Sequence, residues 1–167
     1  MDPVSRLYLD TNMFVAVFEA EGELSEALTR LFMSKRKGKE TFLTTSELTL
    51  AEVLVEPYRQ KDEELIQKYD NWTRTSTYIE VAPVDRDILW HAAVLRSRHH
   101  PVKLPDAIHL STAIRFGCSH FLTADKRLNG RYELTDDRFG IASGPRGVEI
   151  LRPERPIITE LREQAAR

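Results

Sequence analysis

The hydrophobic pattern of the chain alternates between short apolar runs and longer amphipathic segments. Because buried parallel strands are apolar at consecutive positions, we predict five short strands at 6–10, 41–44, 78–82, 120–123 and 148–151. Between them, apolar residues recur at helical spacing near 14–19, 24–32, 46–56, 62–74, 88–95, 105–116 and 157–166. Strands separated by helices favour one parallel sheet covered on both faces. We therefore predict an α/β fold with a central, mainly parallel five-stranded sheet.

Local signals set the predicted boundaries. Pro57 is expected to end the helix at 46–56, since proline removes a backbone donor. Pro105 suits the first turn of a helix, and Gly117 suits the end of that helix. The polar stretch 126–147 contains five glycine or proline residues and predicts a long loop. No repeat, low-complexity tract or linker divides the sequence, so residues 1–167 are expected to form a single domain.

The composition narrows the class of protein. Hydrophobic residues make up 41% of the chain and charged residues 30%, which excludes a disordered chain, a collagen and a disulfide scaffold. Cys118 is the only cysteine, so an intrachain disulfide and a thiolate metal cluster are excluded. The longest purely apolar run, 13–18, is far shorter than the roughly 20 residues of a membrane span. The first residues lack the basic flank and apolar core of a signal peptide, so we expect a cytoplasmic protein without membrane contact.

Two acids directly follow predicted strands. Asp10 comes after the run 7–9, and Asp125 comes after the run 121–124. In a parallel sheet the carboxyl ends of the strands line the ligand crevice, so both acids are candidates for a site. Two plainer interpretations stay open, with Asp10 as a helix cap and Asp125 as an Asx turn that opens the loop.

Two further acids lie in predicted helices. Glu52 is the only charged residue between 48 and 55, and it falls within an apolar helical stripe. The other members of that stripe are Leu48, Ala51 and Val55. A carboxylate buried there must be paired, protonated or bound to a metal, and a buried ion pair is the plainer alternative. Asp106 lies in a first helical turn, where an acid also simply favours the helix dipole. Glu47, by contrast, is explained by a capping box at 44–47.

The four acids become informative when they are taken together. Four carboxylates that point at one place raise each other's pKa unless a counter-charge is present. A hard divalent cation is the simplest counter-charge, and carboxylates with water suit Mg²⁺ or Mn²⁺. No histidine or cysteine is placed for zinc. Because such ions promote in-line displacement at phosphorus, the pattern suggests phosphodiester hydrolysis.

Four segments carry a resemblance to a known family. They are Tyr8-Leu9-Asp10-Thr11-Asn12, then 45–54, then 104–113, and then 121–125. In this order and at this spacing they resemble the PIN-domain ribonucleases, most closely the VapC-like toxin branch, over about residues 6–151. The resemblance implies a three-layer α/β/α sandwich, an acidic site for Mg²⁺ or Mn²⁺, and endonucleolytic cleavage of RNA. It also implies an antitoxin protein as partner and a homodimer.

The resemblance assigns roles to individual residues. The positions that match the family's catalytic and metal-binding acids are Asp10, Glu52, Asp106 and Asp125. Asn12 and Thr123 match polar positions that orient an acid or the attacking water. The nucleophile that the family implies is water activated by the metal, so no protein nucleophile is needed.

The chain departs from the family pattern around Asp125. Ala124 stands where relatives often have Asn, and Lys126 and Arg127 stand where relatives often offer another acid. These departures leave open whether one or two metal ions bind. The loop at 126–147 is longer than a compact toxin usually carries, and it is a substrate lid, a partner site or decoration.

Positive charge is concentrated in three segments, 35–39, 96–103 and 126–131. They are candidate contacts for RNA phosphates or, alternatively, solvated helix ends. The whole chain has 24 basic and 26 acidic residues, and this net charge of −2 by itself gives no hint of nucleic acid. Without the four candidate acids, 24 basic residues face 22 acidic ones, which leaves +2. His109, three residues after Asp106, either packs in the core or lies near the site.

Two other functions compete with the ribonuclease hypothesis. A module of the same fold that binds RNA or protein without cleaving would need no active site, although retention of all four acids argues against decay. A phosphatase of the haloacid-dehalogenase type also uses an aspartate at a strand end. That chemistry wants a second aspartate two residues later, where this chain has Asn12.

Overall fold

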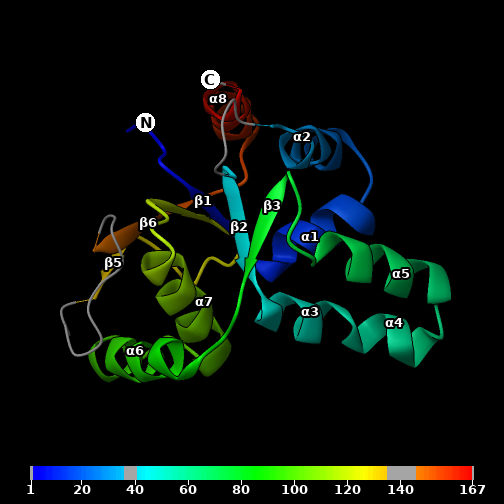
Figure 1. The fold of residues 1–167 in the computed structure, drawn as a ribbon. Coiled ribbons are helices and arrows are strands. Elements are labelled where there is room, and N and C mark those ends of the chain that lie inside the picture. The colour runs from blue at the N-terminus through cyan, green and yellow to red at the C-terminus, as the bar shows by residue number, and fades with distance from the viewer. Residues whose placement is uncertain (1, 36–40, 135–145, 167) are drawn as a thin grey trace.

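The central sheet has six strands in the part of the chain that the structure describes (Figure 1). The structure is a computed structural model, and it describes residues 2–35, 41–134 and 146–166. The strands are β1 (Leu7–Leu9), β2 (Leu43–Ser46), β3 (Ile79–Ala82), β4 (His120–Leu122), β5 (Arg131–Glu133) and β6 (Gly147–Leu151). They are ordered β3-β2-β1-β4-β6-β5, and all pairs are parallel except that β5 runs antiparallel to β6.

Helices connect β1 to β2, β2 to β3 and β3 to β4, and helices cover both faces of the sheet (Figure 1). They are α1 (Thr11–Phe18), α2 (Glu23–Phe32), α3 (Glu47–Val53), α4 (Val55–Gln60), α5 (Glu63–Trp72), α6 (Arg86–Arg98), α7 (Leu104–Arg115) and α8 (Arg155–Ala165). Within the described ranges, no helix is both long enough and apolar enough to cross a membrane.

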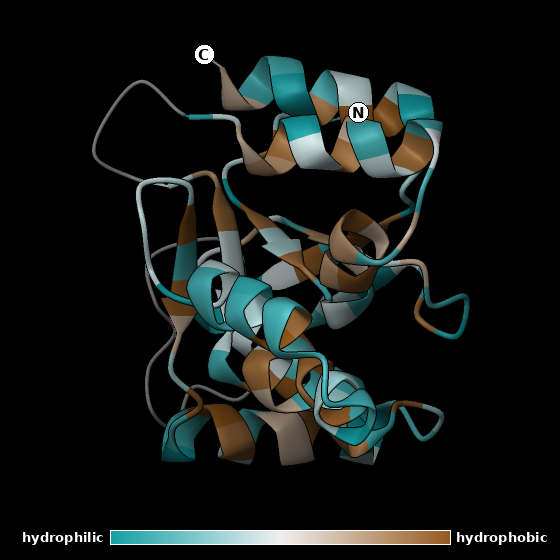
Figure 2. Cartoon of the chain, turned by 90° about the vertical axis from the view of Figure 1, so that its right-hand side faces the viewer, coloured by the Kyte–Doolittle hydropathy of each residue, from teal (hydrophilic) through white to brown (hydrophobic). Residues whose placement is uncertain are grey.

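Side chains of the central strands alternate between two hydrophobic cores. Leu7 and Leu9 of β1 enter the core shared with α1, α2, α5 and α8, whereas Tyr8 enters the core shared with α6 and α7. Figure 2 shows hydrophobic and hydrophilic residues alternating along the helices, as expected of helices with one buried face. The predicted three-layer α/β/α architecture is therefore confirmed.

The strand register brings three strand ends to one edge of the sheet. Leu9 of β1 pairs with Leu122 of β4, which pairs with Leu151 of β6. The next residues continue this alignment, because the Asp10 amide donates to the Leu122 carbonyl at 3.1 Å and the Thr123 amide donates to the Leu151 carbonyl at 3.1 Å. Residues that follow β1, β4 and β6 therefore lie beside one another, at the edge where α/β sheets bind ligands.

The predicted helix boundaries hold at two places and fail at one. Pro105 lies in the first turn of α7, and Gly117 follows that helix with a φ of +70°. Pro57, however, does not end a helix. The preceding helix already ends at Val53, and Pro57 lies in the first turn of α4, where its missing N–H breaks no helical bond.

The segment predicted as the loop 126–147 contains a strand that was not predicted, β5, so the sheet has six described strands and not five. Only Tyr132 is buried in β5, so the strand is too short and too polar to show a period in the sequence. Gly147 lies against it, and a Cβ at this position would lie 2.8 Å from the Tyr132 carbonyl oxygen. Glycine is therefore needed where β5 and β6 approach each other. Residues 135–145 of the predicted loop lie outside the described residues.

Candidate active site

Asp10 lies at the junction between β1 and α1. It is the N-cap residue of α1, and its Oδ1 accepts a hydrogen bond from the Thr11 amide at 2.8 Å. The helix-cap interpretation of Asp10 is therefore present in the structure. The residue is only 8% exposed, and its second oxygen accepts from the Thr123 hydroxyl after β4. Capping is thus one of several contacts that this carboxylate makes.

Asn12 and Thr123 hold the second carboxylate oxygen of Asp10. The Asn12 side-chain nitrogen and the Thr123 hydroxyl each donate to Asp10 Oδ2 at 2.5 Å. Asn12 also accepts from the Ala124 amide at 3.0 Å, which ties the first turn of α1 to the end of β4. A carboxylate has about four lone-pair sites, so the three donors to Asp10 leave about one for a further partner. The remaining lone pair is on Oδ1, which has one donor, whereas Oδ2 has two.

Asp125 lies in a turn that is anchored to two strands. Its amide donates to the Thr123 hydroxyl oxygen at 2.9 Å, and its Oδ1 accepts from the Arg127 amide at 2.9 Å. The second contact is the Asx turn that the sequence allowed. Arg152, directly after β6, donates to the carbonyl oxygens of Thr123 at 3.1 Å and of Asp125 at 2.7 Å. The position of Asp125 is therefore set by both β4 and β6.

The Arg127 guanidinium covers the carboxylate of Asp125. Its Nε lies 3.0 Å from both carboxylate oxygens, and its Nη2 donates to Oδ2. These hydrogen bonds and the positive charge hold the pKa of Asp125 below its usual value, although partial burial opposes them. The same Nη2 lies 3.7 Å from Asp106 Oδ2. One arginine therefore contacts two of the candidate acids.

Asp106 reaches the same region from the first turn of α7. Its side chain is 19% exposed. Burial raises the pKa of Asp106 above its usual value, and the charges of Asp125 and Asp10 raise it further, while Arg127 opposes them. Asp10, Asp106 and Asp125 thus interact electrostatically across the end of the sheet. The structure brings these three acids into one neighbourhood.

Glu52 joins this region through its own partners. Its Oε2 accepts from the hydroxyl of Thr11, the residue after Asp10, and lies 2.8 Å from His109 Nε2. Burial raises the pKa of Glu52, but the hydrogen bond and electrostatic interaction with His109, together with the hydrogen bond from the Thr11 hydroxyl, outweigh it. The pKa of this carboxyl therefore lies below its usual value. Glu52 therefore has His109 as a partner, but its side chain is not buried as the ion-pair interpretation assumed.

The predicted apolar stripe around Glu52 is wrong. Ala51 is exposed within α3, and Val55 is exposed in the next helix, because α3 already ends at Val53. The buried residues of α3 are instead Thr49 and Val53. The Glu52 side chain is 32% exposed. It is therefore open to solvent and to a ligand on one side.

His109 links Glu52 to the hydrophobic core. It is 1% exposed, and its Nδ1 lies 2.8 Å from the Tyr8 hydroxyl oxygen. Burial raises the pKa of Tyr8 well above its usual value, so the phenol stays protonated and can donate to Nδ1. Nε2 then carries the hydrogen that Glu52 accepts. The Ser46 hydroxyl also lies 3.4 Å from Nδ1. Because α3 begins only at Glu47 and Thr44 lies within β2, the predicted capping box at 44–47 is wrong.

The donor set suits a hard divalent cation. All four candidate side chains offer carboxylate oxygens, which Mg²⁺ and Mn²⁺ prefer as ligands. The mutual repulsion among Asp10, Asp106 and Asp125 is the kind of interaction that a bound cation relieves. Among the described residues, no three His, Cys, Asp or Glu side chains already form a metal cage. The residues therefore fit such an ion by their chemistry, while Arg127 carries part of the compensating charge.

Several residues at the site were not assigned a role from the sequence. Arg152 directly follows a predicted strand, the same signal that identified Asp10 and Asp125, so the sequence contained a way to find it. Tyr8 and Thr11 carry no such signal, because their hydroxyl partners are set by packing between β1, α3 and α7.

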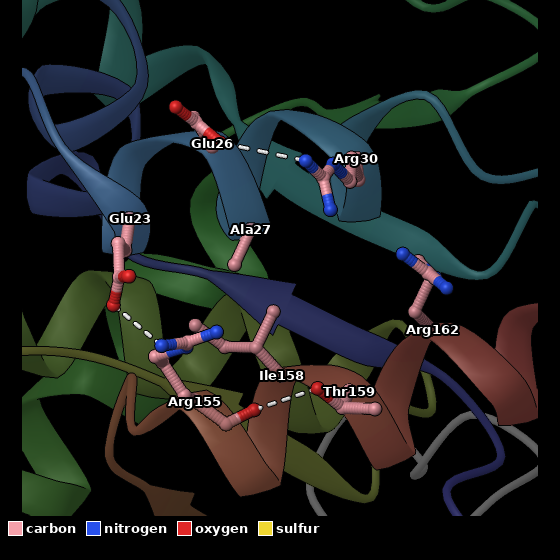
Figure 3. Close-up of a pocket in the computed structure, with 8 residues that line it drawn as sticks. All are labelled: Glu23, Glu26, Ala27, Arg30, Arg155, Ile158, Thr159 and Arg162. Carbon is pink, nitrogen blue, oxygen red and sulfur yellow. Dashed lines mark hydrogen bonds and ion pairs between the residues drawn. The ribbon is translucent and has the colours of Figure 1, made fainter.

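A separate pocket lies between α2 and α8 (Figure 3). Its lining residues are Glu23, Glu26, Ala27, Arg30, Arg155, Ile158, Thr159 and Arg162. Two of its arginines are paired with glutamates, Arg155 with Glu23 and Arg30 with Glu26 at 3.4 Å. None of the four candidate acids lines this pocket, so it is distinct from the site at the strand ends.

Comparisons with known proteins agree with the fold. A sequence model of one protein family, described as the PIN domain, matches residues 7–134. A search of curated protein sequences finds no match.

Three solved structures show the likeness in shape. A toxin–antitoxin complex from Klebsiella pneumoniae has a TM-score of 0.56 and 19% identity, over 90% of this chain and 98% of that chain. VapC20 from Mycobacterium tuberculosis, a toxin that cleaves the sarcin–ricin loop, has a TM-score of 0.58 and 20% identity, over 72% of this chain and 90% of that one. VapBC2 from Rickettsia felis, bound to a DNA fragment from its promoter, has a TM-score of 0.53 and 18% identity, over 71% and 87%. At these identities the likeness is one of fold.

Proposed function

The chain belongs to the PIN-domain family, and on that premise we propose that it is a metal-dependent endoribonuclease, the toxin of a cytoplasmic toxin–antitoxin pair. One observation carries the proposal. Asp10 is oriented by three hydrogen bonds at the end of β1, where its charge interacts with that of Asp106. Clustered carboxylates repel one another and do not help the chain to fold. They are, however, the ligands needed to bind a cation beside a phosphodiester.

The proposed ligands of the ion are Asp10, Glu52, Asp106 and Asp125. When bound, Mg²⁺ or Mn²⁺ would polarise the phosphoryl oxygen, activate water and stabilise the leaving oxygen. No side chain of the site is then required as a nucleophile.

The chain's own residues orient these acids. Asn12 and Thr123 fix the direction of Asp10 by donating to its Oδ2. His109 and Thr11 do the same for Glu52 and favour its ionised form, which is the form that binds a cation. Preorganisation of this kind avoids reorienting the ligands each time the ion or the substrate binds.

RNA and an antitoxin are the proposed partners. The basic segment 96–103 comprises the last residues of α6 and the loop that leads to the helix carrying Asp106, so it is a candidate contact for the phosphates of the substrate RNA. Similar structures that contain an antitoxin support a protein partner. The homodimer stays part of the proposal and is checked by the mass of the protein in solution.

A second function is favoured by one contact. Because Arg127 already neutralises part of the charge of Asp125 and Asp106, the protein could bind RNA or a protein without cleaving. The two functions differ in a simple assay. We expect the purified protein to cut single-stranded RNA, transfer RNA or ribosomal RNA with Mg²⁺ or Mn²⁺, and EDTA to stop it. If all three RNA classes stay intact with either metal while circular dichroism shows a native fold, the binding module replaces the nuclease.

A further inference from the structure

Arg127 supplies positive charge to two acids of the site at once. Its Nε lies 3.0 Å from both oxygens of Asp125, and its Nη2 lies 3.7 Å from Asp106 Oδ2. The guanidinium therefore bridges the acid that follows β4 and the acid in the first turn of α7. These are two of the four carboxylates proposed to hold a divalent ion.

The backbone places Arg127 in this position. Its amide donates to Asp125 Oδ1 at 2.9 Å, and the next residue, Leu128, is buried with 1% exposure. Arg152 donates to the carbonyl oxygen of Leu128 and so fixes the turn from the side of β6. Arg127 is thus held between the carboxylate of Asp125 and the buried side chain of Leu128. Its neighbour Lys126 is exposed.

An arginine in this position differs from a titratable partner. The guanidinium keeps its charge at every pH at which the protein is folded, and its planar fork matches a carboxylate in two hydrogen bonds. Its charge cannot be removed by deprotonation. A divalent ion that binds the oxygens of Asp125 therefore competes with the guanidinium for them, and an ion at Asp106 meets the same positive charge 3.7 Å from Oδ2.

We propose that Arg127 is a built-in cation that competes with the divalent metal for Asp106 and Asp125. In the metal-free protein it compensates the two acids, and metal binding releases it. The inference rests on the proposed function in one respect, namely that a divalent ion binds these acids. It explains how the chain tolerates the concentrated negative charge before a metal arrives.

The test measures metal binding directly. Isothermal titration with Mn²⁺ compares the full-length wild-type protein with Arg127→Gln, Arg127→Lys and Lys126→Gln. Because an ion pair of an exposed arginine is weak, we expect Arg127→Gln to bind Mn²⁺ only about two- to fivefold more tightly. Arg127→Lys keeps the charge but loses the two-pronged contact, so its affinity should fall between the two. Lys126→Gln changes net charge equally in the same turn and should stay within about twofold of wild type.

A second readout follows the arginine itself. In a Mg²⁺ titration of the wild-type protein, the NMR signal of the Arg127 Nε–H group should shift with the same midpoint as metal binding. If Arg127→Gln and wild type bind Mn²⁺ equally, or if the Nε–H signal stays unmoved while metal binds, the competition is overturned and the metal site stands. If neither protein binds Mn²⁺, the proposed metal site fails and this inference fails with it.

Discussion

The hydroxyl of Tyr8 offers a sharp test of the contacts that position Glu52. Tyr8→Phe removes one fully buried oxygen that lies 2.8 Å from His109 Nδ1. The aromatic ring stays, so its stacking on Phe121 at 5.0 Å between centroids is kept. His109 Nδ1 then loses its short partner, and within the described residues the Ser46 hydroxyl at 3.4 Å is the partner that remains. A buried polar group without a partner costs about 1–3 kcal/mol, and Ser46 should reduce this to about 1–2 kcal/mol.

Urea unfolding followed by circular dichroism measures this change in the free energy of unfolding. In a domain of this size, each kcal/mol also lowers Tm by about 2–4 °C. Tyr58→Phe is the matched control, because Tyr58 is 63% exposed and its loss of a hydroxyl should change stability by less than about 0.5 kcal/mol. Equal stabilities of the two variants, with unchanged urea dependence, would refute the role of the Tyr8–His109 hydrogen bond.

Two further predictions follow from the perturbed acids. The pKa of Glu52 is lowered in the folded protein, so its charged form stabilises the fold above the ordinary value of 4.5, and this stabilisation is lost as pH falls through the lower, folded pKa. Urea unfolding should therefore show Glu52→Gln less stable than wild type near neutral pH, with a difference that shrinks in acid, and a pH-independent difference would contradict this. The pKa of Asp106 is raised, so its ionised carboxylate destabilises the metal-free fold above the ordinary value of 3.8. Asp106→Asn should raise Tm in EDTA at neutral pH while RNA cleavage falls, and an unchanged or lower Tm would count against the repulsion of Asp106 by Asp125 and Asp10.

The positions of two candidate acids were predictable from the sequence, because each acid follows a strand. Asp10 and Asp125 end apolar runs, and the parallel register then places them at one edge of the sheet. Predicting this placement requires only the apolar runs in the sequence and the rule that ligands bind at the carboxyl ends of parallel strands. The layered architecture was predictable for the same reason.

Other features depend on packing that no local pattern reports. The two short helices α3 and α4 replace one predicted helix, so Val55 is exposed and the stripe around Glu52 disappears. The partner of Glu52 is His109 on α7, and this pairing needs the tertiary contact between α3 and α7. From the sequence, Arg127 was notable only because it stands where relatives often have an acid. A sequence does not show which carboxylate a nearby guanidinium will contact.

The most direct test of the account compares RNA cleavage by Asp10→Asn and Asp85→Asn. Asp85 caps α6, and it is not among the charges that shift the pKa of Glu52, Asp106 or Asp125. Asparagine caps a helix about as well as aspartate, so Asp85→Asn should keep the fold while it changes net charge by the same amount as Asp10→Asn. With Mn²⁺ present, we expect Asp10→Asn to lose about 100-fold or more in cleavage rate, as for removal of one key charged or polar group in an active site. Asp85→Asn should stay within about twofold of wild type. Cleavage by natively folded Asp10→Asn at the wild-type rate would contradict the claim that the acids at the strand ends are the active site.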